Sequence, residues 1–249
     1  MNTMIFARLK GDTTRIQNRY DCYYKPNYYK NLLKTSNDSP FTVIHRYNDG
    51  NVSNLISYSL YGNNPKYYKY IDYNVNYIKD NLPGWVMRIY LHDKVDKEMR
   101  DNLIDKGIQV YIVHDDMVIP GNSAGAFWRF LPLIEDVNCV ILDIDDPIPE
   151  YGGYINKFFN NRNPYKFRGS NDLLSVWHTD HVMAGTIYKK KELKIPINER
   201  TITHWPVRAE FGSDEIFLYY NVTKNIPDKY IQPIKKNFIK KIFQQYPVI

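Results

Sequence analysis

The chain has 249 residues, enough for one sizeable domain with its own hydrophobic core. Its two cysteines, Cys22 and Cys139, lie far apart without a CxxC pair, which argues against a disulfide scaffold or zinc knuckle and favours a reducing cytosol. No apolar stretch approaches the roughly 18 to 20 residues of a membrane-spanning helix, and no secretory signal is recognisable, so we expect a cytoplasmic protein without a membrane span.

The basic residues outnumber the acidic ones, 33 to 27, and give a net charge of +6. This charge suits an anionic partner such as a nucleotide diphosphate or an acidic glycan. The chain lacks the signatures of RNP, zinc-finger and helix-turn-helix modules, so no nucleic-acid partner is expected.

Apolar runs alternate with amphipathic segments from Leu55 to Asp145, a pattern typical of βαβ units and a mainly parallel sheet. Strands are predicted at 55–60, 86–91, 108–113 and 137–142. A first helix is predicted with Asn64 as N-cap, Pro65 at its first position and an end before 83–84. Two further helices are predicted, one from Asp96 to Gly107 and one capped by Ser123 and carrying 127–134.

Outside this region the periodicity is weaker. An Asn48-Asp49-Gly50 turn lies between residues 41–46 and the strand that begins at 54, which predicts a hairpin. The first fifty residues are expected to form an added edge or cap. After Pro147 a strand is predicted at 182–188, a helix near Ser213 and a basic helix from Pro233.

Three acids follow the apolar run at 139–142: Asp143, Asp145 and Asp146. In extended chain, residues two apart point the same way, so we expect Asp143 and Asp145 on one side with Ile144 toward the core. Ligands of open α/β sheets bind outside the carboxyl ends of strands. Carboxylates at this place predict a site for Mn²⁺ or Mg²⁺ that also holds a diphosphate, although a bare DxD pattern is also common in solvated turns.

Five segments together resemble the GT-A glycosyltransferases, especially the short microbial and large-DNA-virus members. They are ISYSLYG at 56–62 with NPKY at 64–67, LPGW at 82–85, GAFWRFL at 125–131, LDID at 142–145 and, more weakly, EFGSDE at 210–215. The resemblance implies a Rossmann-like α/β fold with a mainly parallel sheet and helices on both faces. It implies one catalytic domain over 1–249, with 1–53 as an extension or cap, 54–146 as the nucleotide-binding half and 147–249 as the acceptor-side half.

The same resemblance assigns roles around the donor. Ser57, Tyr58 and Tyr61 are expected to contact the nucleotide, although the two tyrosines read equally well as packed strand aromatics. Asp93, after the second strand, is expected to reach the nucleotide, or to be an exposed bystander. Arg129 is expected to face the donor or Asp143, with a purely structural ion pair as the alternative.

Downstream acids and histidines complete the expected site. Asp214, with Glu215 as second choice, resembles the general base of inverting family members, although acids at a helix start are also ordinary. His181 is the expected third metal ligand, with His178 and His204 as competing candidates. The absence of an HxxGxxKPW element favours inversion over retention.

These features predict a glycosyltransferase that moves a hexosyl or N-acetylhexosaminyl group from a nucleoside-diphosphate sugar, with UDP favoured, to a hydroxyl of a glycan or protein. A viral origin would place it in the host cytoplasm. The alternative is a non-catalytic nucleotide-sugar or glycan-binding module on the same fold. A metal-dependent nuclease or phosphotransferase ranks last, because no other strand ends in a comparable acidic cluster.

Overall fold

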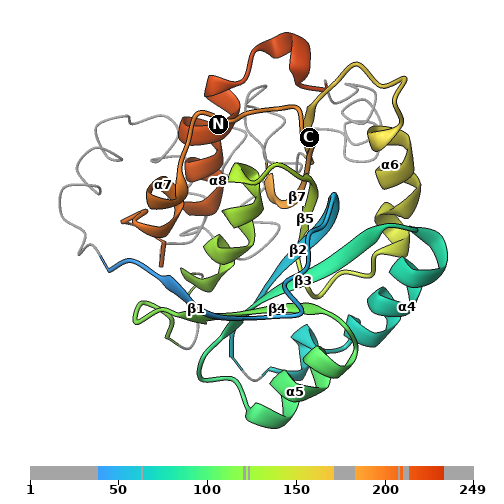
Figure 1. Ribbon diagram of the computed structural model, residues 1–249. Coiled ribbons are helices and arrows are strands. Elements are labelled where there is room, and N and C mark those ends of the chain that lie inside the picture. Colours follow the sequence, from blue (N-terminus) through green and yellow to red (C-terminus); the bar gives the residue numbers. More distant parts are fainter. Residues whose placement is uncertain are drawn as a thin grey trace, which may run out of the picture.

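The computed structural model describes residues 39–62, 64–119, 122, 124–170, 183–206, 208–209 and 213–232. Over these residues the chain forms a seven-stranded sheet flanked by helices (Figure 1). The order of strands across the sheet is β1-β4-β3-β2-β5-β7-β6. Their bounds are β1 Thr42–Tyr47, β2 Asn54–Leu60, β3 Trp85–His92, β4 Gln109–His114, β5 Asn138–Leu142, β6 Phe167–Ser170 and β7 Met183–Lys189.

The centre of the sheet is parallel. β2 pairs in parallel with β3 on one side and β5 on the other, so that Ile56 lies between Met87 and Val140, and β3 continues in parallel to β4. β1, β7 and β6 join through antiparallel pairings. Residues 55–60 are all buried, as expected of a central parallel strand that is covered on both faces. The predicted α/β class with a mainly parallel centre is confirmed.

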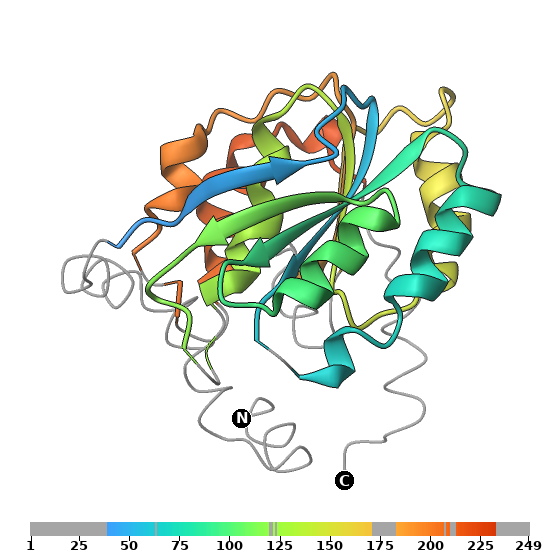
Figure 2. The same cartoon turned by 60° about the horizontal axis from the view of Figure 1, so that its bottom comes forward.

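Helices cover both faces of the sheet (Figures 1 and 2). One face packs against α4, α5 and α6, which contribute Ile78, Leu103 and Phe158 to its core. The other packs against η2, α7 and the α8–η4 segment, and its core is rich in aromatic rings. The bounds are η1 Pro65–Tyr67, α4 Ile71–Asn81, α5 Lys97–Asp105, η2 Ala124–Ile134, α6 Pro149–Phe159, α7 Glu199–Thr203, α8 Ser213–Phe217, η4 Leu218–Val222, η5 Thr223–Asn225 and η6 Asp228–Tyr230.

Two predicted helices take a different form. The first divides into the 3-10 turn η1, which Asn64 caps and Pro65 begins, and the α-helix α4. The segment expected to form an α-helix over 127–134 is the 3-10 helix η2 with Pro132 inside it. Proline has no N–H to donate and its ring clashes with the preceding turn, so a regular α-helix does not continue through it. The proposed cap, Ser123, lies outside the described residues.

The predicted hairpin is wrong. β1 pairs antiparallel with β4 at the edge of the sheet and makes no ladder with β2. The turn residue Asn48 does adopt a left-handed φ of 54°, but its side-chain amide donates to the carbonyls of Ile104 and Ile108, both 2.9 Å away. These bonds direct the turn toward the β4 side of the sheet.

In the second half, the strand predicted at 182–188 corresponds to β7, and a short helix, α8, begins at Ser213 as expected. α6 and β6 were not predicted. Two glycines interrupt the α6 pattern, and one of them, Gly152, packs so tightly on Tyr77 that a Cβ atom would collide with the ring. The helix predicted from Pro233 lies outside the described residues.

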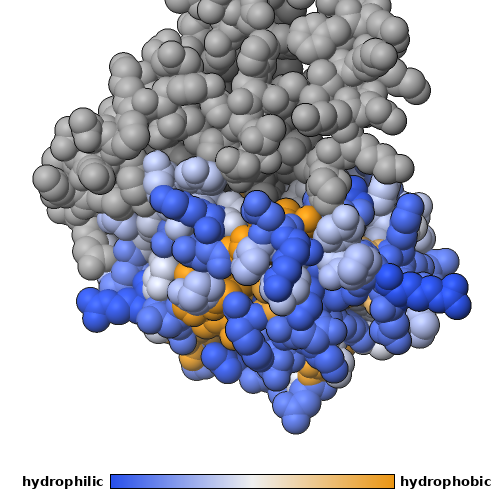
Figure 3. Space-filling view, turned by 90° about the horizontal axis from the view of Figure 1, so that it is seen from above, coloured by the Kyte–Doolittle hydropathy of each residue, from blue (hydrophilic) through white to orange (hydrophobic). Residues whose placement is uncertain are grey.

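The described surface seen in Figure 3 is mostly hydrophilic, with apolar side chains in small areas. The large exposed apolar residues of the described chain are scattered over several elements and one loop: Ile44, Tyr73, Ile119, Ile134 and Tyr154. Singly exposed apolar residues are ordinary on protein surfaces. None of the described helices combines the length and the apolar character needed to cross a bilayer.

Candidate active site

A cavity of about 220 Å³ opens where β2 and β5 end. β2 is the strand at which the sheet order reverses, because the chain adds β3 and β4 on one side and then returns to place β5 on the other. Ligands of open α/β sheets bind at such a switch point, outside the carboxyl ends of the strands. The cavity is lined by Ser59, Tyr61, Tyr67, Ala126, Arg129, Asp143, Ile144, Asp145 and Asp214.

The acids after β5 reach the cavity through a turn. β5 ends at Leu142, and the N–H of Asp146 donates to the carbonyl of Asp143 at 3.3 Å. Both Asp143 and Asp145 line the cavity, but the extended chain that was predicted to align them is absent. Ile144 is buried in the core, as predicted, and also forms part of the cavity wall.

Arg129 is the central cation of the site. Its Nη1 contacts Oδ1 of Asp143 directly, and its Nη2 lies 3.7 Å from Oδ2 of Asp214. Burial lowers the pKa of Arg129, but the two carboxylates outweigh it and the net shift is upward, so the guanidinium stays charged. The predicted pairing of Arg129 with Asp143 is therefore present, and the same side chain reaches the predicted base.

The main chain of Arg129 is attached to β2 by two serines. Its N–H donates to Oγ of Ser59, and its carbonyl accepts from Oγ of Ser57, both at 2.9 Å. Ser57 is fully buried and does not line the cavity, so the nucleotide contact expected of it is not supported. Ser57 instead fixes the backbone that presents the guanidinium.

The two tyrosines expected at the nucleotide take opposite positions. Tyr58 lies on the other face of the sheet, fully buried in the core, and burial raises its pKa well above the usual value. This position agrees with the alternative reading of Tyr58 as a packed strand aromatic and gives no support to the expected nucleotide contact. Tyr61 does line the cavity, where it packs edge-on against Trp128 and so closely over Gly125 that a Cβ there would overlap the ring. Burial raises the pKa of Tyr61 to about 12.

Asp93 lies just after β3, outside the set of residues that line the cavity. Its Oδ2 is 2.6 Å from Nδ1 of His114, and this hydrogen bond raises the pKa of His114. The neighbouring His92 stacks on Trp128 with ring centroids 5.6 Å apart, and its burial lowers its pKa. Asp93 thus orients a histidine at the same edge of the sheet as the cavity.

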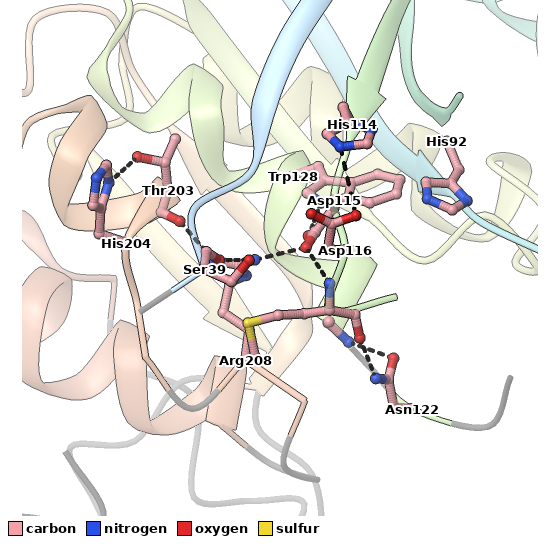
Figure 4. Close-up of polar contacts among 12 residues, drawn as sticks. Ser39, His92, His114, Asp115, Asp116, Asn122, Trp128, Thr203, His204 and Arg208 are labelled. Carbon is pink, nitrogen blue, oxygen red and sulfur yellow. Dashed lines mark hydrogen bonds and ion pairs between the residues drawn. The ribbon is translucent and has the colours of Figure 1, made fainter. Parts of the chain in front are cut away.

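A buried ion pair between Asp115 and Arg208, which sequence reasoning missed, lies beside Trp128 (Figure 4). Oδ1 of Asp115 accepts from Nη2 of Arg208 at 2.8 Å, and Oδ2 accepts from the indole of Trp128 at 2.9 Å. Arg208 also donates to the carbonyls of Thr203 and Ser39. The pair therefore connects the end of β4 and η2 to the segment that leads into α8. Asp115 and Arg208 lie 93 residues apart in the sequence, so no local sequence pattern predicts this ion pair.

α8 carries the proposed base. Ser213, near which this helix was expected to begin, is its first residue, and its Oγ accepts from the indole of Trp205 at 2.9 Å. This buried bond fixes the start of the helix beside Asp214, which lines the cavity. Glu215 follows on the same helix, but only its backbone is described.

Among the described residues that line the cavity, four were not predicted as site residues: Ser59, Tyr67, Ala126 and Ile144. Ser59 could have been found, because it lies two residues from Ser57 and therefore on the same face of β2. Lys66, between Asn64 and Tyr67 on η1, was also missed. Its Nζ lies 2.5 Å from Oδ2 of Asp145, and this contact raises the pKa of the lysine.

Within the described part of the chain, no three His, Cys, Asp or Glu side chains are grouped as a metal site. His181 and His178 lie outside that part, while His204 contacts Oγ1 of Thr203 and does not line the cavity. Asp143 and Asp145 nevertheless fit a hard cation, since Mg²⁺ commonly uses one or two carboxylates and completes its shell with substrate phosphates and water. Oδ2 of Asp143 faces Gly185, where a Cβ atom would come within 2.8 Å.

The scan against protein-family models finds no match, and neither does the comparison with curated proteins. Among solved structures, the chain is similar to a mannosyltransferase from Pyrobaculum calidifontis, determined in complex with GDP-Man and Mn²⁺. The TM-score is 0.43 at 12% sequence identity, and the similarity covers 90% of this chain and 68% of that chain.

Proposed function

We propose that this chain is a metal-dependent glycosyltransferase that moves a sugar from a nucleoside-diphosphate sugar to a hydroxyl group of a glycan or protein. One observation carries the proposal. Three carboxylates, those of Asp143, Asp145 and Asp214, line a single cavity with the guanidinium of Arg129 at the switch point of the sheet. This set combines ligands for a hard cation, a fixed positive charge and an acid–base group in one place.

Asp143 and Asp145 are the residues that would hold Mn²⁺ or Mg²⁺, with oxygens of the diphosphate as further ligands. A bound cation would neutralise charge on the diphosphate, which makes it a better leaving group. Arg129 keeps Asp143 in place and adds a positive charge close to the same phosphates. UDP is the proposed nucleotide of the donor.

Asp214 is the proposed general base, with Glu215 as the second candidate. The acceptor oxygen attacks the anomeric carbon, the bond from that carbon to the diphosphate oxygen breaks, and the hydroxyl proton passes to the carboxylate of Asp214. A single displacement of this kind inverts the configuration at the anomeric carbon. Tyr61 and Tyr67 form an aromatic wall against which the donor can pack.

The proposal is tested by titrating UDP and GDP into the protein by calorimetry, with and without Mn²⁺. One nucleotide should bind in a manganese-dependent manner, and Asp145→Asn should abolish that binding while Asp105→Asn, an exposed acid at the end of α5, leaves it unchanged. The nucleotide that binds then selects the panel of sugar donors for a transfer assay. Binding without transfer or hydrolysis of any donor would favour the non-catalytic module, and absence of binding would refute the donor site.

A further inference from the structure

Among the described residues, the three acids that line the cavity each contact a cation of the protein, but the two cations differ in their freedom to move. Asp143 and Asp214 share Arg129, whose side chain is 7% exposed and whose backbone is fixed to Ser57 and Ser59. Asp145 contacts Lys66, whose side chain is 63% exposed. One counter-ion is therefore locked in the fold, and the other lies at the surface.

The surroundings of Lys66 place its ammonium group at the rim of the cavity. Nζ lies 2.5 Å from Oδ2 of Asp145 and 5.3 Å from the ring centroid of Tyr67, which lines the cavity. The backbone of η1 is held independently, because the N–H of Lys66 donates to the side chain of Asn64 at 3.0 Å. The long lysine side chain can thus swing while the turn that carries it stays in place.

A divalent cation at Asp145 and the ammonium group of Lys66 would compete for the same carboxylate, whose Oδ2 the lysine already contacts. Like charges drawn to one carboxylate also repel each other strongly. Exposed lysine–carboxylate pairs contribute little stability, so this pair costs little to break. Arg129, in contrast, is itself buried and held by its backbone, and its departure would leave Asp143 and Asp214 without their counter-ion, so the exchange falls on Lys66.

We propose that Lys66 is an exchangeable counter-ion, which holds Asp145 before the cation arrives, is displaced by the cation, and then pairs with the incoming diphosphate. This inference rests on the proposed function, because it takes Asp145 as a ligand of the cation. Lys66 weakens binding of the bare cation and strengthens binding of a diphosphate to the cation-loaded site. The protein thereby favours the cation and the diphosphate together over the cation alone.

The first arm of the test measures Mn²⁺ alone, by the loss of the free-ion signal in electron paramagnetic resonance. Lys66→Met should bind Mn²⁺ about two- to fivefold more tightly than the unmodified chain, the range expected on breaking an exposed ion pair. Lys69→Met is the matched control, because Lys69 is an exposed neighbour whose ammonium lies over the ring of Tyr70. It removes the same charge and should change the affinity by less than about 1.5-fold.

The second arm titrates inorganic pyrophosphate into the Mn²⁺-saturated proteins by calorimetry. Lys66→Met should now bind about two- to fivefold more weakly, while Lys69→Met again matches the unmodified chain. A variant that had merely lost structure would weaken binding in both arms, so the opposite signs identify the exchange.

Two results would overturn the proposed exchange. In the first, Lys66→Met and Lys69→Met bind Mn²⁺ with equal affinity. In the second, Lys66→Met binds pyrophosphate as tightly as the unmodified chain, or more tightly. Asp145→Asn separates these failures from failure of the proposed function. If Asp145→Asn weakens Mn²⁺ binding and Lys66→Met does not tighten it, the metal site survives and the counter-ion role is lost. If Asp145→Asn leaves Mn²⁺ binding unchanged, the carboxylate pair is no metal site and both proposals fall.

Discussion

Gly185→Ala should damage the site while leaving the fold intact. Gly185 lies on β7, the antiparallel neighbour of β5, where a Cβ atom would come 2.8 Å from Oδ2 of Asp143 although ordinary contact begins at 3.4 Å. The carboxylate must therefore retreat by about 0.6 Å, more than the roughly 0.5 Å within which functional groups must be held. Because Oδ1 of Asp143 is paired with Arg129, this movement of the carboxylate also distorts the ion pair.

A displacement of this size is expected to cost roughly tenfold to a hundredfold in Mn²⁺ affinity or in the rate of sugar transfer. Stability should change little, within about 1 kcal/mol, because the backbone of Gly185 needs no left-handed φ and alanine reduces the entropy of the unfolded chain. Mn²⁺ titration and urea unfolding of the same preparation measure the two effects separately.

Gly153→Ala is the control, since a Cβ atom there meets nothing within 4 Å. Gly153 lies inside α6, so alanine should raise the free energy of unfolding by about 0.5 to 1 kcal/mol and leave Mn²⁺ binding unchanged. If Gly185→Ala binds Mn²⁺ as tightly as Gly153→Ala does, the oxygen of Asp143 next to β7 takes no part in the site and the reasoning is refuted.

Three further predictions concern the base, the buried ion pair and a histidine. Asp214→Asn should lower sugar transfer by about 10²- to 10⁴-fold and change nucleotide affinity little, and transfer at the original rate would exclude it as the base. Arg208→Met should lower the free energy of unfolding in urea by about 3 to 5 kcal/mol, because Asp115 would be left buried without its cation, and a loss below about 1 kcal/mol would contradict this. The pKa of His114, followed by NMR, should lie above 6.5 and fall in Asp93→Asn, because the hydrogen bond favours the charged ring. The free energy of unfolding that this hydrogen bond contributes is fully present below pH 6.5 and is lost as the pH rises through the folded-state pKa of His114. An unchanged pKa of His114 in Asp93→Asn would disprove the coupling.

The elements that sequence reasoning predicted well are those fixed by local hydrophobicity. Each central strand is a mainly apolar run, and the acids at 143–145 follow one of them directly, so their place at the carboxyl ends of the parallel strands could be predicted. The contact of Arg129 with Asp143 was also anticipated. These features depend on short stretches of chain or on the general geometry of parallel sheets.

What sequence reasoning missed depends on distant partners. The hairpin failed because the amide of Asn48 bonds to carbonyls 56 and 60 residues away, which no local turn signal reveals. Tyr58 and Ser57 belong to one strand, and only the packed structure shows which face meets η2. Lys66 escaped notice because an exposed lysine after a turn looks like solvated surface until Asp145 is placed beside it.

The buried pair of Asp115 and Arg208 also sets an order of events during synthesis of the chain. Asp115 leaves the ribosome 93 residues before Arg208, a delay of roughly 5 to 20 seconds at ordinary rates of translation. Until Arg208 emerges, burial of the carboxylate without its cation would cost several kcal/mol, so we expect Asp115 to stay in contact with water. The packing around Asp115 is therefore expected to be completed only after the second half of the chain has been synthesised.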